Sequence, residues 1–126
     1  MLGSFINGRE LMKMQTEHFF RCLADPVRFN IVLLLLHKQG ELCSCELADS
    51  LGQNLSSVSR HLVLLRNKGV VTERREELWL YYQINQHLPK WAKEILNNAY
   101  HGNQHRLVEP LAAMQSLDAR RICVAS

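Results

Sequence analysis

The chain has 126 residues, a net charge of +3, 47 % hydrophobic residues and 21 % charged residues. This composition is typical of a globular protein with one domain and one core, and it excludes a disordered chain. The longest apolar run, residues 31–36, is too short to cross a membrane, and residues 1–15 lack the pattern of an export signal. We therefore expect a cytoplasmic protein whose four cysteines are reduced.

The first third of the chain predicts two helices. Residues 10–24 carry apolar side chains at spacings of three and four, as in an amphipathic helix. Asp25 is a good cap for a second helix, with Pro26 at its first position. This second helix is apolar on nearly all sides, so we expect it at the centre of the core, running to about Lys38 and ended by Gly40.

A helix-turn-helix pattern follows. A short helix from about Cys45 to Leu51 is joined by a three-residue turn to a longer helix, which Asn54 caps and Gly69 ends. This layout is that of a DNA-binding unit whose second helix is the recognition helix. The recognition helix has a polar half near its start and directs these side chains inward: Leu55, Val58, Leu62 and Leu65.

After Gly69 the apolar period changes from that of a helix to that of a strand. Residues 70–85 predict a β-hairpin with a charged tip at residues 75–77. Trp79 and Tyr81 lie on one face of its second strand. A hairpin directly after a recognition helix is a wing, so the sequence predicts a winged helix-turn-helix.

The last part of the chain returns to a helical period. Residues 88–100 form an amphipathic pattern that His101 and Gly102 break, and a short helix near Pro110 precedes a loose tail. The predicted fold class is mainly α with a small β-hairpin, dimerising through its terminal helices. The expected divisions are an N-terminal lead at 1–11, a winged helix-turn-helix domain at 12–102, and a C-terminal helix and tail at 103–126.

The charge pattern indicates DNA as a partner. Residues 50–72 contain no Asp or Glu, which suits contact with a polyanion. The start of the recognition helix offers free backbone N–H groups to phosphate, and Arg60 is long enough to reach a guanine edge. One such module covers little DNA, so we expect a homodimer on a two-fold operator. The predicted DNA contacts are Gln53, Ser56, Ser57, Ser59, Arg60, His61, Arg74 and Arg75.

Two cysteines, Cys43 and Cys45, lie one residue apart at the start of the helix before the recognition helix. Soft thiolates select thiophilic metals and metalloids. A helix N-terminus stabilises a thiolate, so we expect a lowered pKa at this pair. Helical positions two apart point about 200° away from each other, so the first turn must open before both sulfurs reach one ion. Such opening would disturb the recognition helix and weaken DNA binding.

Three segments, "LADPVRFNIVLLL", "GELCSCELADSLGQNLSSVSRHLVLLRNKGVV" and "WLYYQINQHLPKWAKEILNNAY", resemble the ArsR/SmtB family of bacterial metal-sensing repressors, and more narrowly its arsenical-responsive branch. The resemblance implies a homodimeric winged helix-turn-helix repressor of a metalloid-resistance operon. It implies that DNA binding needs no cofactor and that trivalent arsenic or antimony releases the operator. The family's metal motif maps onto Cys43 and Cys45, and Ala48 stands where the branch often has a third cysteine.

Several alternatives stay open. The third ligand is Cys22, Cys123 of either subunit, a small thiol or solvent, with core packing the plainer role for Cys22. Repressors with the same motif that respond to cadmium, lead or zinc add a cysteine in an N-terminal arm, and residues 1–21 contain none. A redox-sensing repressor, in which Cys43 or Cys45 pairs with Cys123, is another class. No nucleophile–base set, paired carboxylates or glycine-rich phosphate loop is present, so we expect no enzyme.

Overall fold

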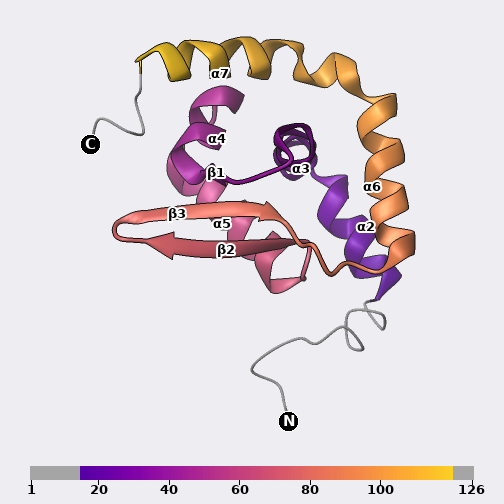
Figure 1. Cartoon of the computed structure of the whole chain (residues 1–126). Coiled ribbons are helices and arrows are strands. Elements are labelled where there is room, and N and C mark those ends of the chain that lie inside the picture. The colour runs from indigo at the N-terminus through magenta and orange to yellow at the C-terminus, as the bar shows by residue number, and fades with distance from the viewer. Residues whose placement is uncertain (1–14, 121–126) are drawn as a thin grey trace.

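The computed structural model describes residues 15–120 as a mainly helical structure with a small antiparallel sheet (Figure 1). Its helices are α2 (Thr16–Ala24), α3 (Pro26–Lys38), α4 (Ser44–Leu51), α5 (Leu55–Asn67), α6 (Lys90–Gly102), the 3-10 helix η1 (Gln104–Leu107) and α7 (Val108–Arg120). Its strands are β1 (Leu42–Cys43), β2 (Val71–Glu76) and β3 (Trp79–Ile84). The predicted fold class is confirmed, with α4 and α5 as the helix-turn-helix and β2–β3 as the wing. Of the predicted first helix, residues 10–14 lie outside the described residues.

Helix α3 forms the centre of the core, as its apolar sequence predicts. Residues 31–35 are all buried, and burying a large apolar side chain contributes about 1.5–3 kcal/mol relative to leaving it in water. The predicted cap is present. Asp25 Oδ1 accepts hydrogen bonds from the N–H groups of Val27, at 2.8 Å, and Arg28, at 3.1 Å, and Pro26 occupies the first helical position.

The predicted end of α3 at about Lys38 is confirmed, but the residue that closes the helix is Gln39 and not Gly40. Gln39 takes the left-handed conformation, with φ 56°, and its N–H donates to the carbonyl of Leu35 at 3.1 Å. The helix therefore closes one residue before the glycine. A glutamine can adopt this conformation at some cost in strain.

The helix-turn-helix is held by local caps. Gly52 ends α4 with φ 65°, and Asn54 Oδ1 accepts from the N–H of Ser57 at 2.8 Å to begin α5. The inward prediction for Leu55 is wrong, since this side chain is 48 % exposed. A helical wheel gives the direction of a side chain around the axis, but not how far along the axis the neighbouring elements reach. The remaining predicted inward residues are buried: Val58, Leu62 and Leu65.

The sheet has three strands in the order β1-β3-β2, all antiparallel. The predicted tip at residues 75–77 is wrong, because Arg75 and Glu76 pair with Leu80 and Trp79 and the turn is formed by residues 77–78. Strand β1 was not predicted. It pairs only Leu42 with Tyr82 and Cys43 with Tyr81, and two residues are too few to show an alternating pattern in the sequence.

The C-terminal part covers the top and one side of the molecule in Figure 1. Helix α6 begins after Pro89 and ends at Gly102, close to its prediction. Helix α7 is longer than the short helix predicted near Pro110, and it packs against α4. Between them, Arg106 donates to Asn30 Oδ1 on α3 at 2.8 Å. Within residues 15–120, no helix is both long and apolar enough to cross a membrane.

Candidate thiol site and DNA-binding face

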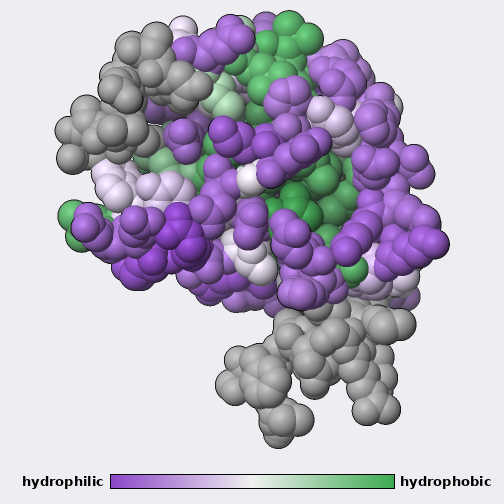
Figure 2. Space-filling view, in the orientation of Figure 1, coloured by the Kyte–Doolittle hydropathy of each residue, from purple (hydrophilic) through white to green (hydrophobic). Residues whose placement is uncertain are grey.

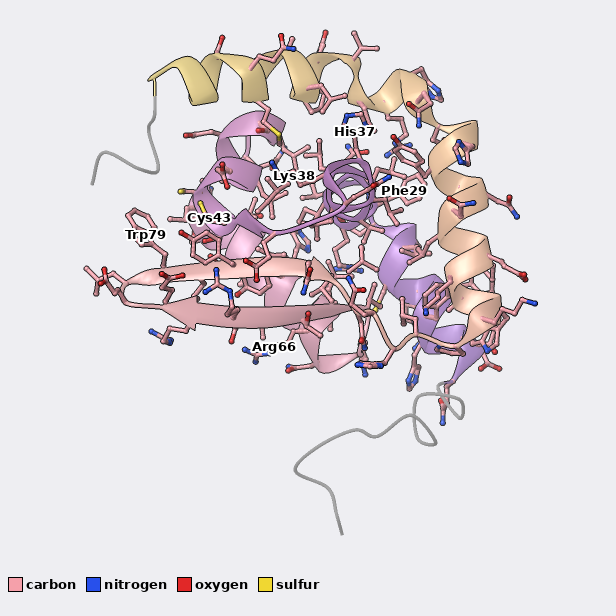
Figure 3. The ribbon with its side chains drawn as sticks, in the orientation of Figure 1. Phe29, His37, Lys38, Cys43, Arg66 and Trp79 are labelled. Atoms are coloured by element: carbon pink, nitrogen blue, oxygen red, sulfur yellow. The ribbon has the colours of Figure 1, made fainter. Side chains whose placement is uncertain are left out.

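The two cysteines lie at the junction between the sheet and the helix-turn-helix. Cys43 is the last residue of β1 and the N-cap of α4, with an extended backbone (φ −83°, ψ 159°), while Cys45 is in the first turn of α4. Their sulfur atoms are 2.9 Å apart. The prediction that the helix must open to bring them together is therefore wrong, because Cys43 is not helical. Figure 3 shows Cys43 between α4 and the wing.

A capping box fixes the backbone at this junction. The N–H of Cys43 donates to Glu46 Oε1 at 2.9 Å, and the Cys43 side chain receives the backbone N–H of Glu46 in return. The motif normally has Ser or Thr at the cap, with Glu three residues later. The glutamate at that spacing was the signal in the sequence that could have located the cap at Cys43.

Burial, and not the helix dipole, decides the acidity of Cys43. This residue is 2 % exposed, and burial, aided by the Glu46 carboxylate, raises the pKa of its thiol from 9.0 to about 11. Backbone N–H groups of Cys45 and Glu46 act in the opposite direction but are outweighed. The predicted lowering of the pKa is thus wrong for Cys43, since a thiolate loses more from leaving water than it gains from the helix start.

The candidate third ligands do not join this pair in the described residues. Cys22 is buried on α2 and lines a separate cavity of about 100 Å³ between α2, α3 and α5. Cys123 lies outside the described residues. Across residues 15–120, no group of three or more His, Cys, Asp or Glu side chains is placed to hold a metal ion. Cys45 is disulfide-bonded in the structure, so the pair offers two thiols only when reduced.

The donor set still fits a thiophilic ion or metalloid. Two sulfurs at close range are soft ligands, and soft ligands select such ions over hard cations. An atom bonded to both sulfurs at about 2.3 Å, with an angle of 90° or more, holds them at least about 3.3 Å apart. Cys43 and Cys45 are already neighbours, but they must separate from 2.9 Å to take one ion between them.

One predicted DNA contact, Arg74, is held by carboxylates beside the thiol pair. Its Nε and Nη2 donate to the two oxygens of Glu41, each at 2.8 Å, and its Nη1 donates to Glu76 at 2.6 Å. This hydrogen bonding lowers the pKa of Glu41. Arg74 also lies over the ring of Tyr81, 4.7 Å from its centroid. The guanidinium is therefore occupied within the protein.

The start of α5 presents the polar surface that the sequence predicts. Ser56 Oγ donates to Asn54 Oδ1 at 3.0 Å, so the cap and this serine form one polar group at the helix start. Neither Arg60 on α5 nor Arg75 on the wing forms an ion pair with any residue in 15–120, and both are exposed. Of the other predicted contacts on this face, two are exposed and two are half-buried: Gln53 and Ser56, then Ser57 and Ser59.

His61 faces the protein rather than the polar face of α5. Its Nδ1 is 3.2 Å from Nη1 of Arg28, and its Nε2 is 4.0 Å from Oδ1 of Asp25. Asp25 and Arg28 belong to the start of α3, and Arg28 Nε also donates to the carbonyl of Cys22 at 2.9 Å. The structure thus gives His61 a place in the contact between α3 and α5.

Sequence reasoning missed a second internal ion pair. Arg66 belongs to the acid-free stretch, but its Nη1 donates to both oxygens of Glu73 on the wing at 3.1 Å. The hydroxyl of Tyr82 donates to Glu73 as well, at 2.6 Å, and burial and this hydrogen bond raise the pKa of that hydroxyl. The only signal in the sequence for the Arg66–Glu73 pair was that Glu73 is the first acidic residue after the acid-free stretch.

The visible surface around the wing is mostly polar. Figure 2 shows mostly hydrophilic residues over the hairpin and an apolar patch beside it. A cavity of about 400 Å³ at the contact of α3, β3 and α6 is lined by Leu36, Ile84, Leu96 and polar residues of α6. None of the predicted site residues lines this cavity.

Comparison with known proteins decides the family. Residues 25–73 match the family described as "Bacterial regulatory protein, arsR family". The "Arsenical resistance operon repressor" of Escherichia coli (strain K12) is 40 % identical over 82 % of this chain and 92 % of its own length. The chain belongs to the arsR family. A "Cadmium resistance transcriptional regulatory protein CadC homolog" of Staphylococcus aureus is 30 % identical over 69 % of each chain.

Solved structures agree with this assignment. A homodimeric winged helix-turn-helix DNA-binding domain from Mycobacterium bovis, a possible ArsR-family transcriptional regulator, matches with a TM-score of 0.59 and 26 % identity. The match covers 85 % of this chain and 94 % of that one. The relatives of this arsR-family protein are DNA-binding transcriptional regulators. The protein is therefore a transcriptional repressor and not an enzyme.

The part of the chain that matches the family includes the candidate thiol site. Residues 25–73 contain α3, both cysteines of the thiol pair, α5 and the start of the wing. Five elements lie outside that match: α2, β3, α6, η1 and α7. The thiol pair and the polar start of α5 therefore belong to one family module.

Proposed function

We propose that this repressor controls a metalloid-resistance operon and leaves its operator when trivalent arsenic or antimony binds Cys43 and Cys45. The single observation that carries the proposal is the 2.9 Å separation of the two sulfurs at the junction of β1 and α4. The 40 % identity to an arsenical resistance operon repressor supports the same conclusion. DNA binding itself requires no cofactor.

The DNA complex uses α5 in the major groove and the wing beside it. Arg60 reaches a base edge, and Gln53, Ser56, Ser57 and Ser59 contact phosphates or bases near the start of α5. Arg75 contacts the backbone from the wing. We place the protein in the cytoplasm because this partner is the bacterial operator.

The active form is a homodimer that joins through α2 and α6. Phe20 on α2 is 48 % exposed although it is aromatic, and its neighbour Phe19 meets Trp91 of α6 edge to face at 5.2 Å. These two helices therefore already share an aromatic contact that a second subunit would extend. A two-fold dimer then presents two α5 helices to two half-sites.

The position of the cysteines suggests how release works. Cys43 belongs to the sheet, where it pairs with Tyr81 of the wing, while Cys45 belongs to α4, which packs against α5. When the two sulfurs separate to hold one ion, the sheet and the helix-turn-helix must shift against each other. The ion acts by favouring the shifted state over the DNA-bound state. A difference of about 3 kcal/mol weakens DNA binding more than 100-fold.

The test is fluorescence anisotropy of the protein on its own promoter fragment, in excess reductant, titrated with arsenite, antimonite, cadmium and zinc. We expect arsenite to release the wild type and to have no effect on Cys43→Ser or Cys45→Ser. Cys22→Ala is the matched control, since it removes a buried thiol away from the pair and should still respond. Release of both serine variants by arsenite would overturn the proposal.

A second candidate is a redox-sensing repressor of the same fold. The disulfide at Cys45 in the structure favours it. Cys43 or Cys45 would pair with Cys123, which lies outside the described residues. The same assay separates the two functions: release by a mild oxidant without any metalloid, reversed by reductant and lost in Cys123→Ser, supports redox sensing. A cadmium-, lead- or zinc-responsive repressor is supported instead if one of those ions releases the reduced protein and arsenite does not.

A further inference from the structure

One row of side chains crosses the sheet from the thiol pair to the wing. Cys43 of β1 is opposite Tyr81 of β3, and Tyr81 is opposite Arg74 of β2. Residues directly opposite each other in a sheet share a face. Glu41 precedes Cys43 by two positions and so returns to the same face, where it meets the guanidinium of Arg74.

The contacts of Arg74 connect the two ends of this row. Two parallel hydrogen bonds of 2.8 Å join its Nε and Nη2 to the two oxygens of Glu41. Its Nη1 donates to Glu76 at 2.6 Å, and the guanidinium lies over the ring of Tyr81. A bidentate pair fixes orientation as well as distance, so it transmits displacement better than a single contact.

The strand that carries Cys43 needs such a connection. β1 has only two residues and pairs with β3 through Leu42 and Cys43 alone. When a bound ion displaces Cys43, a strand this short can slip along β3 or separate from it. The displacement would then be lost in the segment before β1 and would not reach the wing. The Glu41–Arg74 pair ties the start of β1 to β2, on the far side of β3.

We propose that Arg74 is a positioning residue that, through Glu41, couples displacement of Cys43 to the wing. This role rests on the proposed function, since it needs a ligand at the thiol pair. This role takes the place of the DNA contact predicted for Arg74 from the sequence, because two carboxylates already bind its guanidinium. The neighbouring Arg75 is exposed, and no carboxylate in residues 15–120 pairs with it, so Arg75 is the wing arginine that meets DNA.

The experiment compares Glu41→Gln, Arg74→Gln, their double variant, and Arg75→Gln as the matched control. For each, the operator Kd is measured with and without saturating arsenite under reducing conditions, and arsenite binding is measured by calorimetry without DNA. Thermal unfolding checks that each variant folds. Arg74 is about half exposed and Glu41 is half-buried at the surface, and ion pairs at the surface contribute little, so little stability should be lost.

We expect arsenite to raise the operator Kd of the wild type about 100-fold, near the upper end of the usual range of allosteric coupling. In Glu41→Gln and Arg74→Gln the ratio of the operator Kd with arsenite to the Kd without it falls about tenfold or more. The operator Kd without arsenite and the affinity for arsenite change less than threefold. The double variant falls no further, because both changes break one link. Arg75→Gln keeps the full ratio but binds DNA more weakly, with a salt slope reduced by about 1.

Two results would overturn the coupling role. In the first, Arg74→Gln keeps the full ratio and loses DNA affinity and salt dependence as Arg75→Gln does, which identifies a phosphate contact. In the second, the Arg74 and Glu41 variants lower the ratio additively, so they do not act through each other. A wild type that binds arsenite in calorimetry but keeps its operator overturns the proposed function itself, and the coupling role with it.

Discussion

Cys22 and Cys43 are both almost fully buried thiols, 3 % and 2 % exposed, yet the two regions around them differ in kind. Cys22 lies within α2, where α3 and α5 enclose it. Cys43 lies between two elements, because it is both the last residue of β1 and the N-cap of α4. The sulfur of Cys45 is 2.9 Å from its own. Burial alone therefore does not identify a sensor.

The two regions also surround their thiols with opposite charges. Burial raises the pKa of Cys22, but Arg28, Lys68 and Arg21 act against it. At Cys43 the nearby charge is the Glu46 carboxylate, which adds to the effect of burial. The comparison suggests that the Cys22 region supplies stability, while the Cys43 region can convert a ligand into movement.

The largest effect should come from emptying the core beside Cys22. Phe19 is fully buried and packs edge to face on Trp91, so Phe19→Ala should lower the free energy of unfolding by about 3–5 kcal/mol. Urea unfolding measures this loss. Phe20→Ala, at the exposed neighbour, should lower the free energy of unfolding much less. Because Phe20 lies on the proposed dimer surface, this comparison is made at a protein concentration high enough to keep the dimer. A Phe19→Ala loss below about 2 kcal/mol would contradict a purely structural role for this region.

The next effect separates the two thiols by response. Cys43→Ala should remove the whole arsenite-dependent change in operator affinity, more than 100-fold, or about 3 kcal/mol. Cys22→Ala should keep that response and instead lose about 1 kcal/mol or more of stability, because it leaves a small gap in the core. Anisotropy and urea unfolding of the same preparations give both numbers. Equal responses of the two variants would break the comparison.

Stability at high pH should distinguish the thiols by acidity. The folded state keeps Cys43 protonated up to about pH 11, while an unfolded thiol ionises at 9.0. The folded state therefore binds the proton more tightly, and its stability falls as the pH rises from 9 towards 11. The loss is at most about 2–3 kcal/mol. Cys43→Ala should flatten this part of the curve more than Cys22→Ala, measured by unfolding in reductant; the reverse order would contradict the assignment.

The smallest effect concerns the choice of ion by protonated thiols. A divalent cation must displace a proton from each thiol, so cadmium affinity should rise up to about tenfold per pH unit for each thiol bound. Arsenous acid carries hydroxides that leave as water with the thiol protons, so arsenite affinity should stay nearly flat between pH 6 and about 8. Calorimetry across this range measures both slopes. Equal slopes would show that proton release does not favour the metalloid at this site.

The sequence determined the parts of this protein that depend on near neighbours. Asp25 with Pro26 and Asn54 fixed two helix starts through hydrogen bonds within three residues. The apolar run of α3 and, apart from Leu55, the apolar period of α5 identified the buried residues of these helices, and the spacing of two cysteines marked the thiol pair. Sequence reasoning failed where a residue's partner lay far along the chain or where burial opposed a local effect.

Only the tertiary structure decided what the candidate site residues contact. Arg74 found Glu41, which is 33 positions away in the chain, and so became a link within the protein instead of an evident phosphate contact. β1 exists because β3 pairs with it, and that pairing makes Cys43 an extended cap beside Cys45. Its acidity then followed from burial. Caps and periodicity act through the local backbone, whereas ion pairs, strand pairing and desolvation depend on how distant segments meet.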